Sequence, residues 1–274
     1  MITNSLPLPA AVFSILSGLI EERLGLFFAE DDASILSEKV TPRALELGFD
    51  SLLDYYYYLR YDDGASIELP RLAEALVVNE TYIGRELDQL TALVDILVPR
   101  LLTTRPRLRL WSAACSTGEE PLTLAGMLDD RGLLPNVELL ASDISQRVLE
   151  SARSGKFSGR SLRALPPAAS GWLTFDGATA SARPDLLSRV AFRQLNLSDA
   201  QAIQRMGKLD VIVCRNVLIY FRDSTINSVI RGFCEALNPG GYLLVGASES
   251  LLRFGGGFRC EEHGGAFFYR KETA

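Results

Sequence analysis

The chain has 274 residues, of which 47% are hydrophobic and 23% charged, so it can bury a substantial core and does not belong to the disordered class. A net charge of −6 gives no general reason to expect nucleic-acid binding. The chain has a single histidine, His263, which argues against a Ser-His-Asp triad and against a multi-histidine metal site, so no metal is expected. Four widely spaced cysteines without a CxxC pair fit reduced thiols. The N-terminus lacks both the basic start of a signal peptide and an apolar run of membrane-spanning length. We therefore expect a cytoplasmic protein that does not insert into a membrane.

Residues 1–78 predict a small all-helical domain. The first helix has apolar residues at helical spacing and ends at Gly25, which suits a C-cap. Asp50 or Ser51 precedes the third helix as a possible N-cap, and we expect helix to resume after Pro70. The expected helices cover residues 11–24, 33–46, 51–60 and 71–78.

The sequence pattern changes after residue 78. Residues 79–104 form a linker with a long amphipathic helix, and residues 105–274 then alternate apolar strands with helices. This alternation is typical of a doubly wound parallel sheet of the Rossmann-like α/β class. Two extended runs around His263-Gly264-Gly265 predict an antiparallel hairpin at the sheet edge. The expected strands are 108–113, 137–142, 189–196, 209–214 and 241–247, and the expected helices are 119–131, 145–154 and 223–237.

The loop after the first strand is a candidate ligand site, because ligands of open parallel sheets bind beyond the carboxyl ends of the strands. This loop, 112–118, consists of small residues, and Gly118 is able to take a positive φ. It is not the G-x-G-x-x-G pattern, and Glu119 and Glu120 would repel a pyrophosphate at the helix N-terminus. A positively charged cofactor fits better; the alternative is that the glutamates only complement the helix dipole.

Polar residues also follow three further strands. Asp143 ends the second strand and suits a contact to a ribose, with an N-cap for the next helix as the alternative. Arg215 and Asn216 leave the fourth strand, and Arg215 fits a ligand contact and an internal ion pair equally well. Asn196, at the end of the third strand, by itself indicates only a turn.

Four segments resemble motifs of the chemotaxis receptor (CheR-type) protein-glutamate O-methyltransferases. The segment WSAACSTGEEPLTLA is similar to the cofactor loop of that family, and ASDISQRVLESARSGKF is similar to its second motif. The segment VIVCRNVLIYF resembles C-R-N-V-x-I-Y-F, and VVNETYIGRE resembles N-x-T-x-F-F-R-E. The motifs occur in the family's order between residues 79 and 250, so the chain is identified as a member.

The resemblance implies S-adenosylmethionine as cofactor, S-adenosylhomocysteine as product, and methylation of glutamate carboxylates on a chemoreceptor or related signalling protein. It also implies a small β subdomain inserted at about residues 156–193, and we expect a monomer. Arg85 and Tyr220 would stand nearest the transferred methyl group, with Arg85 positioning the acceptor carboxylate. The residues implied to contact the cofactor are Asn79, Thr81, Arg85, Ala114, Glu120, Asp143, Asn196, Leu197, Arg215 and Asn216.

Two departures from the family pattern bear on activity. The aromatic pair before the arginine is Ile83-Gly84 here, which predicts a more open pocket or a looser Arg85. Residues 1–77 carry a net charge of −8 and the remainder +2, so the helical domain should repel an acidic receptor helix.

These departures leave alternatives to the leading hypothesis. One is a signalling module that binds S-adenosylmethionine or S-adenosylhomocysteine with little or no catalytic activity. Another is a methyltransferase for a different nucleophile. An amine acceptor would need a base, which the motifs do not offer, whereas a glutamate with a pKa of about 4.3 is already ionised at neutral pH.

Overall fold

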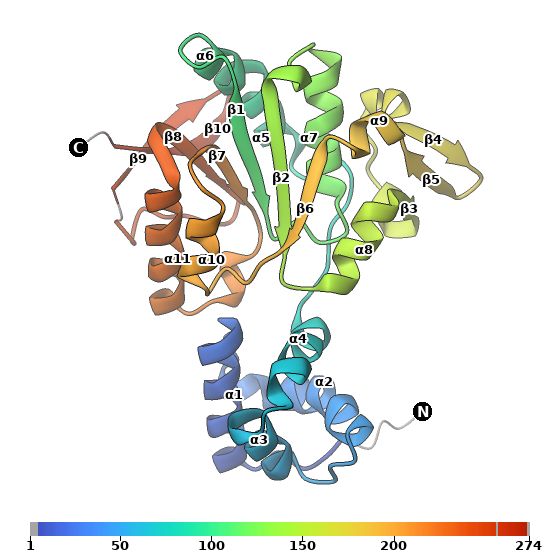
Figure 1. The fold of residues 1–274 in the computed structure, drawn as a ribbon, viewed down its shortest axis with the longest axis vertical. Coiled ribbons are helices and arrows are strands. Elements are labelled where there is room, and N and C mark those ends of the chain that lie inside the picture. Colours follow the sequence, from blue (N-terminus) through green and yellow to red (C-terminus); the bar gives the residue numbers. More distant parts are fainter. Residues whose placement is uncertain (1–4, 256, 273–274) are drawn as a thin grey trace.

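A computed structural model describes residues 5–255 and 257–272. Residues 1–4 of the predicted helical domain and residues 273–274 of the predicted C-terminal sheet region lie outside the described residues. Four helices pack together in the N-terminal part, below the carboxyl ends of the main sheet in Figure 1. They are α1 (Ala10–Leu24), α2 (Ala33–Glu46), α3 (Leu52–Tyr61) and α4 (Ala65–Leu76), with a 3₁₀ turn, η1 (Glu30–Asp32), before α2.

The ends of these helices follow from local chemistry. Gly25 terminates α1 in the left-handed region with φ of 78°, which confirms the predicted C-cap. The Ser51 hydroxyl accepts a hydrogen bond from the backbone N–H of Asp54 and caps α3. The prediction that helix resumes only after Pro70 is wrong, because α4 already begins at Ala65. Pro70 is tolerated inside α4 since it lies on the exposed side, where water can satisfy the freed carbonyl.

The linker contains one continuous helix in three parts. These are α5 (Leu87–Ala92), the π-helical η2 (Leu93–Leu97) and α6 (Val98–Leu102). The widened π turn comes directly before Pro99, which has no N–H to donate to the preceding turn. The sequence pattern predicts the helix but not this change in its winding.

The C-terminal part is built on a seven-stranded sheet with strand order β6-β2-β1-β7-β8-β10-β9. All pairs are parallel except those made by β10, so the sheet is doubly wound and ends in an antiparallel hairpin, as predicted. Gly264 and Gly265 form the hairpin turn with φ of 59° and 78°. The strands are β1 (Leu108–Ala113), β2 (Val137–Asp143), β6 (Val190–Gln194), β7 (Leu209–Cys214), β8 (Leu237–Val245), β9 (Phe258–His263) and β10 (Ala266–Lys271).

Helices cover both faces of this sheet, so its central strands are apolar on both sides. In β7, Val211 packs into the core beneath α7 and the linker helix, whereas its neighbour Ile212 packs into the opposite core with α10 and α11. This second core continues into the N-terminal helices. The helices are α7 (Glu119–Asp130), α8 (Gln146–Ser154), α10 (Ala200–Arg205) and α11 (Asp223–Ala236).

A second, three-stranded antiparallel sheet with strand order β3-β5-β4 lies between α8 and β6 and projects to one side in Figure 1. Trp172 anchors it: the indole is buried against Gly126 of α7, and its Nε1 donates to Asp130 at 2.9 Å. The elements are β3 (Lys156–Ser158), η4 (Gly159–Leu162), η5 (Pro167–Gly171), β4 (Leu173–Asp176), β5 (Thr179–Ala182) and α9 (Pro184–Leu187).

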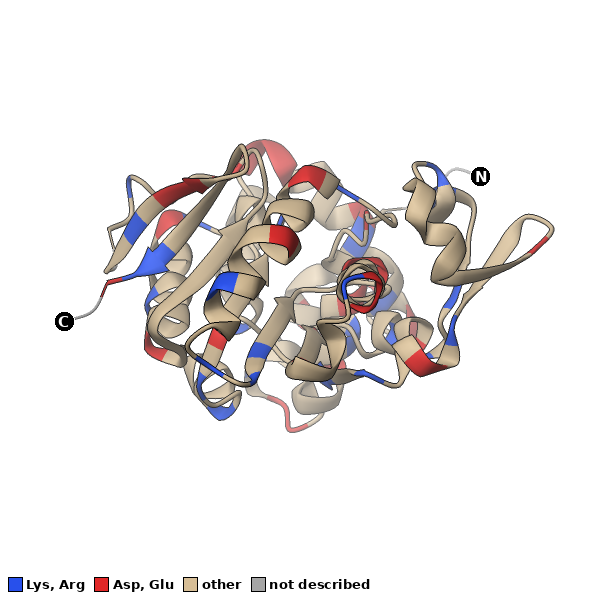
Figure 2. Cartoon of the chain, turned by 90° about the horizontal axis from the view of Figure 1, so that it is seen from above, with Lys and Arg blue, Asp and Glu red and all other residues tan. Residues whose placement is uncertain are grey.

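Charges of both signs are interspersed over the molecule in Figure 2. Within residues 5–255 and 257–272, no helix combines the length and the apolar character that crossing a membrane requires.

Candidate functional site

The strand order places a crevice between β1 and β7. The chain runs from β1 outward through β2 to β6 and then returns to β7 on the other side of β1, so the order reverses at this pair. Such a reversal is where open α/β sheets bind ligands. The loop after β1 and the Arg215-Asn216 pair after β7 therefore flank the crevice.

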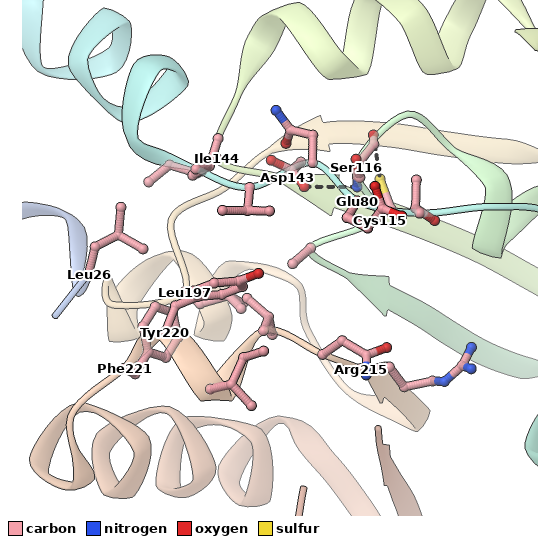
Figure 3. A pocket seen from close by; sticks show the side chains of 18 of the residues that line it. Leu26, Glu80, Cys115, Ser116, Asp143, Ile144, Leu197, Arg215, Tyr220 and Phe221 are labelled. Atoms are coloured by element: carbon pink, nitrogen blue, oxygen red, sulfur yellow. Dashed lines mark hydrogen bonds between the residues drawn. The ribbon is translucent and has the colours of Figure 1, made fainter. Parts of the chain in front are cut away.

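A cavity of about 430 Å³ opens there, between the sheet and the N-terminal helices. This volume is in the range of pockets that bind small molecules. Figure 3 shows Asp143 and Ser116 on one side of it, Arg215 at one end, and Leu26, Tyr220 and Phe221 toward the other end. The residues that the sequence assigns to catalysis or cofactor binding all line this cavity: Asn79, Thr81, Arg85, Ala114, Glu120, Asp143, Asn196, Leu197, Arg215, Asn216 and Tyr220. Glu119, the other glutamate of the loop, does not.

The loop after β1 turns sharply against Asp143. Ala114 and Ser116 have φ of 60° and 49°, a left-handed conformation that costs side-chain-bearing residues energy and is concentrated at functional sites. Gly118 has φ of 92°, as predicted, and a Cβ there would lie 2.8 Å from the Cβ of Ala152. The Asp143 carboxylate accepts hydrogen bonds from the backbone N–H groups of Ser116 at 2.9 Å and Ser145 at 3.0 Å.

Asp143 is not the N-cap of α8. Ser145 has that role, since its hydroxyl accepts from the N–H of Val148. Burial raises the pKa of Asp143, although the two backbone hydrogen bonds oppose the rise. A carboxylate has about four acceptor positions, so Asp143 keeps acceptor capacity on its cavity side.

The two glutamates that begin α7 have different surroundings. Glu119 is fully buried away from the cavity and accepts hydrogen bonds from the hydroxyls of Thr117 and Ser161. It therefore joins the helix to η4 of the inserted sheet. Glu120 faces the cavity and accepts from Ser112 at 2.6 Å and from Arg215 at 3.0 Å. Burial raises the pKa of Glu120 despite the opposing charge of Arg215.

Arg215 is almost completely buried and forms internal ion pairs. Its side chain is 2% exposed and bridges Glu120 to Glu86, which lies 3.2 Å from its Nη2. Its Nε donates to Gln89 at 3.1 Å, and its Nη2 also donates to the backbone carbonyl of Arg85. Of the two interpretations from the sequence, the internal pair is the one observed, although Arg215 also lines the cavity.

Three further residues hold the site together, and the sequence reasoning missed them. Glu86 accepts from Arg215, from Asn216 at 3.0 Å and from the N–H of Ala247 at 3.0 Å. Burial alone would raise the pKa of Glu86, but these hydrogen bonds and the charge of Arg215 lower it. Glu249 accepts from the N–H groups of Asn216, Leu218 and Gly246, each at 2.8 Å. The third is Gln89. For Glu86 the available signal was an acid directly after Arg85, and for Glu249 an acid in the loop that follows β8.

Arg85 and Tyr220 both line the cavity. The Arg85 side chain is 28% exposed, and its Nη1 donates to the carbonyl of Glu80 at 2.7 Å. Tyr220 belongs to η6 (Leu218–Tyr220), and its backbone carbonyl accepts from the N–H of Phe27 at 2.9 Å. Burial raises the pKa of Tyr220, while the nearby charge of Arg85 opposes the rise.

Asn196 connects the sheet to the N-terminal helices. Its side-chain amide donates to the carbonyl of Arg23 at 2.9 Å and its oxygen accepts from the N–H and hydroxyl of Ser198. This is the turn role that its sequence position alone indicates. Leu197, next to it, presents its side chain to the cavity and is buried.

The expectation of an open or loose region at Ile83-Gly84 does not match the packing. Ile83 is completely buried. Gly84 has φ of 77°, and a Cβ there would lie 3.0 Å from the ring of Pro166, so the inserted sheet fills the space next to it. The N–H of Gly84 donates to Thr123 and that of Ile83 to the carbonyl of Ser161. The segment that carries Arg85 is therefore fixed on two sides.

The cavity suits a ligand with polar and cationic groups. Among the described residues, the Ser116 hydroxyl is the only buried side-chain polar atom without a hydrogen-bond partner, and Ser116 lines this cavity. Buried polar atoms are normally satisfied, so this hydroxyl points to a bound group. The carboxylates of Glu120 and Asp143 favour positive charge and hydroxyl donors, which are the groups that S-adenosylmethionine carries.

Comparison with known proteins identifies the family of the chain. Residues 79–264 match the family model "CheR methyltransferase, SAM binding domain". The chain is 35% identical to chemotaxis protein methyltransferase 2 of Vibrio cholerae, over 92% of this chain and 88% of that protein. It is 32% identical to a chemotaxis protein methyltransferase of Vibrio parahaemolyticus (86% and 87% covered) and 33% identical to that of Salmonella typhimurium (91% and 87% covered). The chain therefore belongs to the CheR methyltransferase family, and it is a methyltransferase that uses S-adenosylmethionine.

Proposed function

We propose that this protein transfers the methyl group of S-adenosylmethionine to glutamate side-chain carboxylates of chemoreceptor-type signalling proteins, as its relatives' names connect them with chemotaxis. The observation that carries the proposal is that Arg85 and Tyr220 line the same cavity as the motif residues, close enough for the charge of Arg85 to act on the Tyr220 hydroxyl. A cation beside a hydroxyl suits the recognition of a carboxylate acceptor.

The cavity residues divide into cofactor and acceptor contacts. Asp143 would accept hydrogen bonds from the ribose hydroxyls, and Glu120 would bind the ammonium of the methionyl part. Leu197 would border the adenine together with the backbone of Asn196. Asn79, Thr81, Ala114, Arg215 and Asn216 complete the cofactor walls, Arg215 mainly by holding Glu120 in place.

The bound cofactor supplies an electrophilic methyl group on a sulfonium. The protein's own residues then need to align the acceptor and exclude water, because a glutamate is already ionised at neutral pH. Such alignment contributes about 7–11 kcal/mol in favourable cases. Arg85 orients the acceptor carboxylate, and Tyr220 fixes it from the facing wall. No side-chain base is needed; His263 pairs with Glu261 in the terminal hairpin and does not line the cavity.

The test uses radiolabelled S-adenosylmethionine and membranes that carry the organism's own chemoreceptors. We expect label in the receptors that mild base releases as methanol, which is diagnostic of a carboxyl methyl ester. Arg85 also lines the cofactor cavity, so Arg85→Ala should lower incorporation by a far larger factor than it weakens the binding of S-adenosylhomocysteine, measured by calorimetry. Cofactor binding by the wild-type protein without any label in the receptors would favour the non-catalytic signalling module instead.

A further inference from the structure

The mouth of the cavity is bordered by exposed apolar side chains. Phe27, Ile35, Val78 and Ile219 all line the cavity, and they are 37%, 49%, 52% and 58% exposed. We call these four residues the apolar rim. They come from four separate segments: the stretch after α1, helix α2, the stretch after α4, and η6. Large apolar side chains gathered at a ligand opening mark an interaction surface.

The charges near the rim do not suit docking of an acidic partner. Arg43 of α2 is turned inward, where its guanidinium pairs with buried Glu68. Asp32, at the start of α2, lines the cavity and adds negative charge to the mouth. The whole region 1–77 has a net charge of −8. The net charge of this region therefore opposes long-range attraction of an acidic helix.

Besides the buried Arg215, two cations line the cavity, and a third lies on the rim, where the guanidinium of Arg222 is 4.2 Å from the centroid of the Phe27 ring. Arg85 donates to the carbonyl of Glu80 and lies 4.0 Å from the carboxylate of Glu86. Lys39 of α2 donates to the carbonyl of Leu76 at 2.6 Å. Both side chains line the cavity. A carboxylate in the cavity is therefore within the part of the molecule that Arg85 and Lys39 line, while the chain on either side of it meets the mainly apolar rim.

From this arrangement we infer that the acceptor is a polypeptide segment in which the methylated glutamate is flanked by bulky apolar side chains that pack on the rim. The inference rests on the proposed function, because it describes the acceptor of the same site. Burial of the rim supplies the docking energy, whereas Arg85 and Lys39 select the carboxylate. Recognition of the acceptor accordingly combines apolar contacts on the rim with the charges of Arg85 and Lys39.

Substitutions on facing sides of the rim test this inference. The double variant Ile35→Ser/Ile219→Ser and the single variant Ile35→Lys are compared with Ile67→Ser, which removes a 65% exposed side chain of α4 outside the cavity. The measurements are KM for receptor-bearing membranes, the affinity for S-adenosylhomocysteine by calorimetry, and the melting temperature. We expect the double variant to raise KM by about tenfold, and Ile35→Lys also to raise it, with unchanged cofactor affinity.

A failure of the apolar inference can be distinguished from a failure of the proposed function. An unchanged KM in the double variant, or a lower KM in Ile35→Lys, would overturn the apolar inference, and the second result would show docking by charge. Equal losses in Ile67→Ser would also overturn it. If the wild-type protein methylates no receptor, the proposed function itself fails. If the wild-type protein is active and only the rim result is negative, the function stands.

Discussion

Replacing Arg215 by methionine should destabilise the protein more than any substitution of a surface ion pair. The guanidinium is 2% exposed and faces Glu120 and Glu86, whose side chains are 14% and 23% exposed. Methionine keeps most of the volume but leaves these two carboxylates without their shared cation. Removing one partner of a buried pair costs about 3–5 kcal/mol, because the remaining charge stays desolvated.

Urea unfolding without cofactor measures this loss. The control is Arg205→Met, whose ion pair with Asp199 is exposed on both sides (66% and 47%) and should contribute less than about 1 kcal/mol. The loss in Arg215→Met should shrink at acidic pH, since protonation of the carboxylates removes the unpaired charge. Equal stabilities of the two variants at neutral pH would refute the assignment of Arg215 as the centre of the site's ion-pair network.

Three further predictions concern the loop, the pH dependence and the inserted sheet. Gly118→Ala combines a positive φ with a steric clash and should lower the free energy of unfolding by about 1–3 kcal/mol. Gly18→Ala, in open space on α1, should raise it by about 0.5–1 kcal/mol. Urea unfolding measures both changes. Because burial raises the pKa of Glu120, the folded protein keeps the Glu120 proton at a pH where the unfolded chain has lost it. As the pH increases through the pKa of the folded state, the free energy of unfolding should fall and the affinity for the cofactor should rise. Glu120→Gln should flatten both pH profiles, measured by calorimetry. Arg163→Ala removes the ion pair to Glu80, whose backbone carbonyl accepts a hydrogen bond from Arg85. The variant should raise KM for the acceptor severalfold with little change in cofactor affinity. Arg160→Ala, at a more exposed position beside Glu80, is the control and should leave KM nearly unchanged.

The architecture of the sheet was predictable because it depends on local patterns. Apolar runs bounded by turn residues gave the five parallel strands to within a few residues, and His263-Gly264-Gly265 marked the hairpin. Gly25 and Gly118 were identifiable because each position needs a left-handed backbone. The short helix α10 was missed, since six residues between two strands carry too little periodicity to stand out.

The arrangement of the site was only partly predictable. Positions at strand ends identified the cavity residues, but the partner of each depends on tertiary contacts between distant segments. Glu119 and Glu120 are adjacent in sequence, yet one joins the inserted sheet and the other faces the cavity. Likewise, the sequence alone did not show that Arg215 would pair with Glu86, which is more than a hundred residues away. The packing of Gly84 against Pro166 likewise joins segments distant in sequence, so the sequence pattern does not predict it.

Identification of the methylated residue tests the central claim most directly. Receptors incubated with the protein and S-adenosylmethionine would be digested and mapped by tandem mass spectrometry, beside a sample treated with Arg85→Ala. We predict methyl esters on glutamate side chains in the wild-type sample and their loss in the variant. A methyl group on lysine or another nucleophile, or esters that persist without Arg85, would contradict the account of a carboxylate acceptor positioned by Arg85.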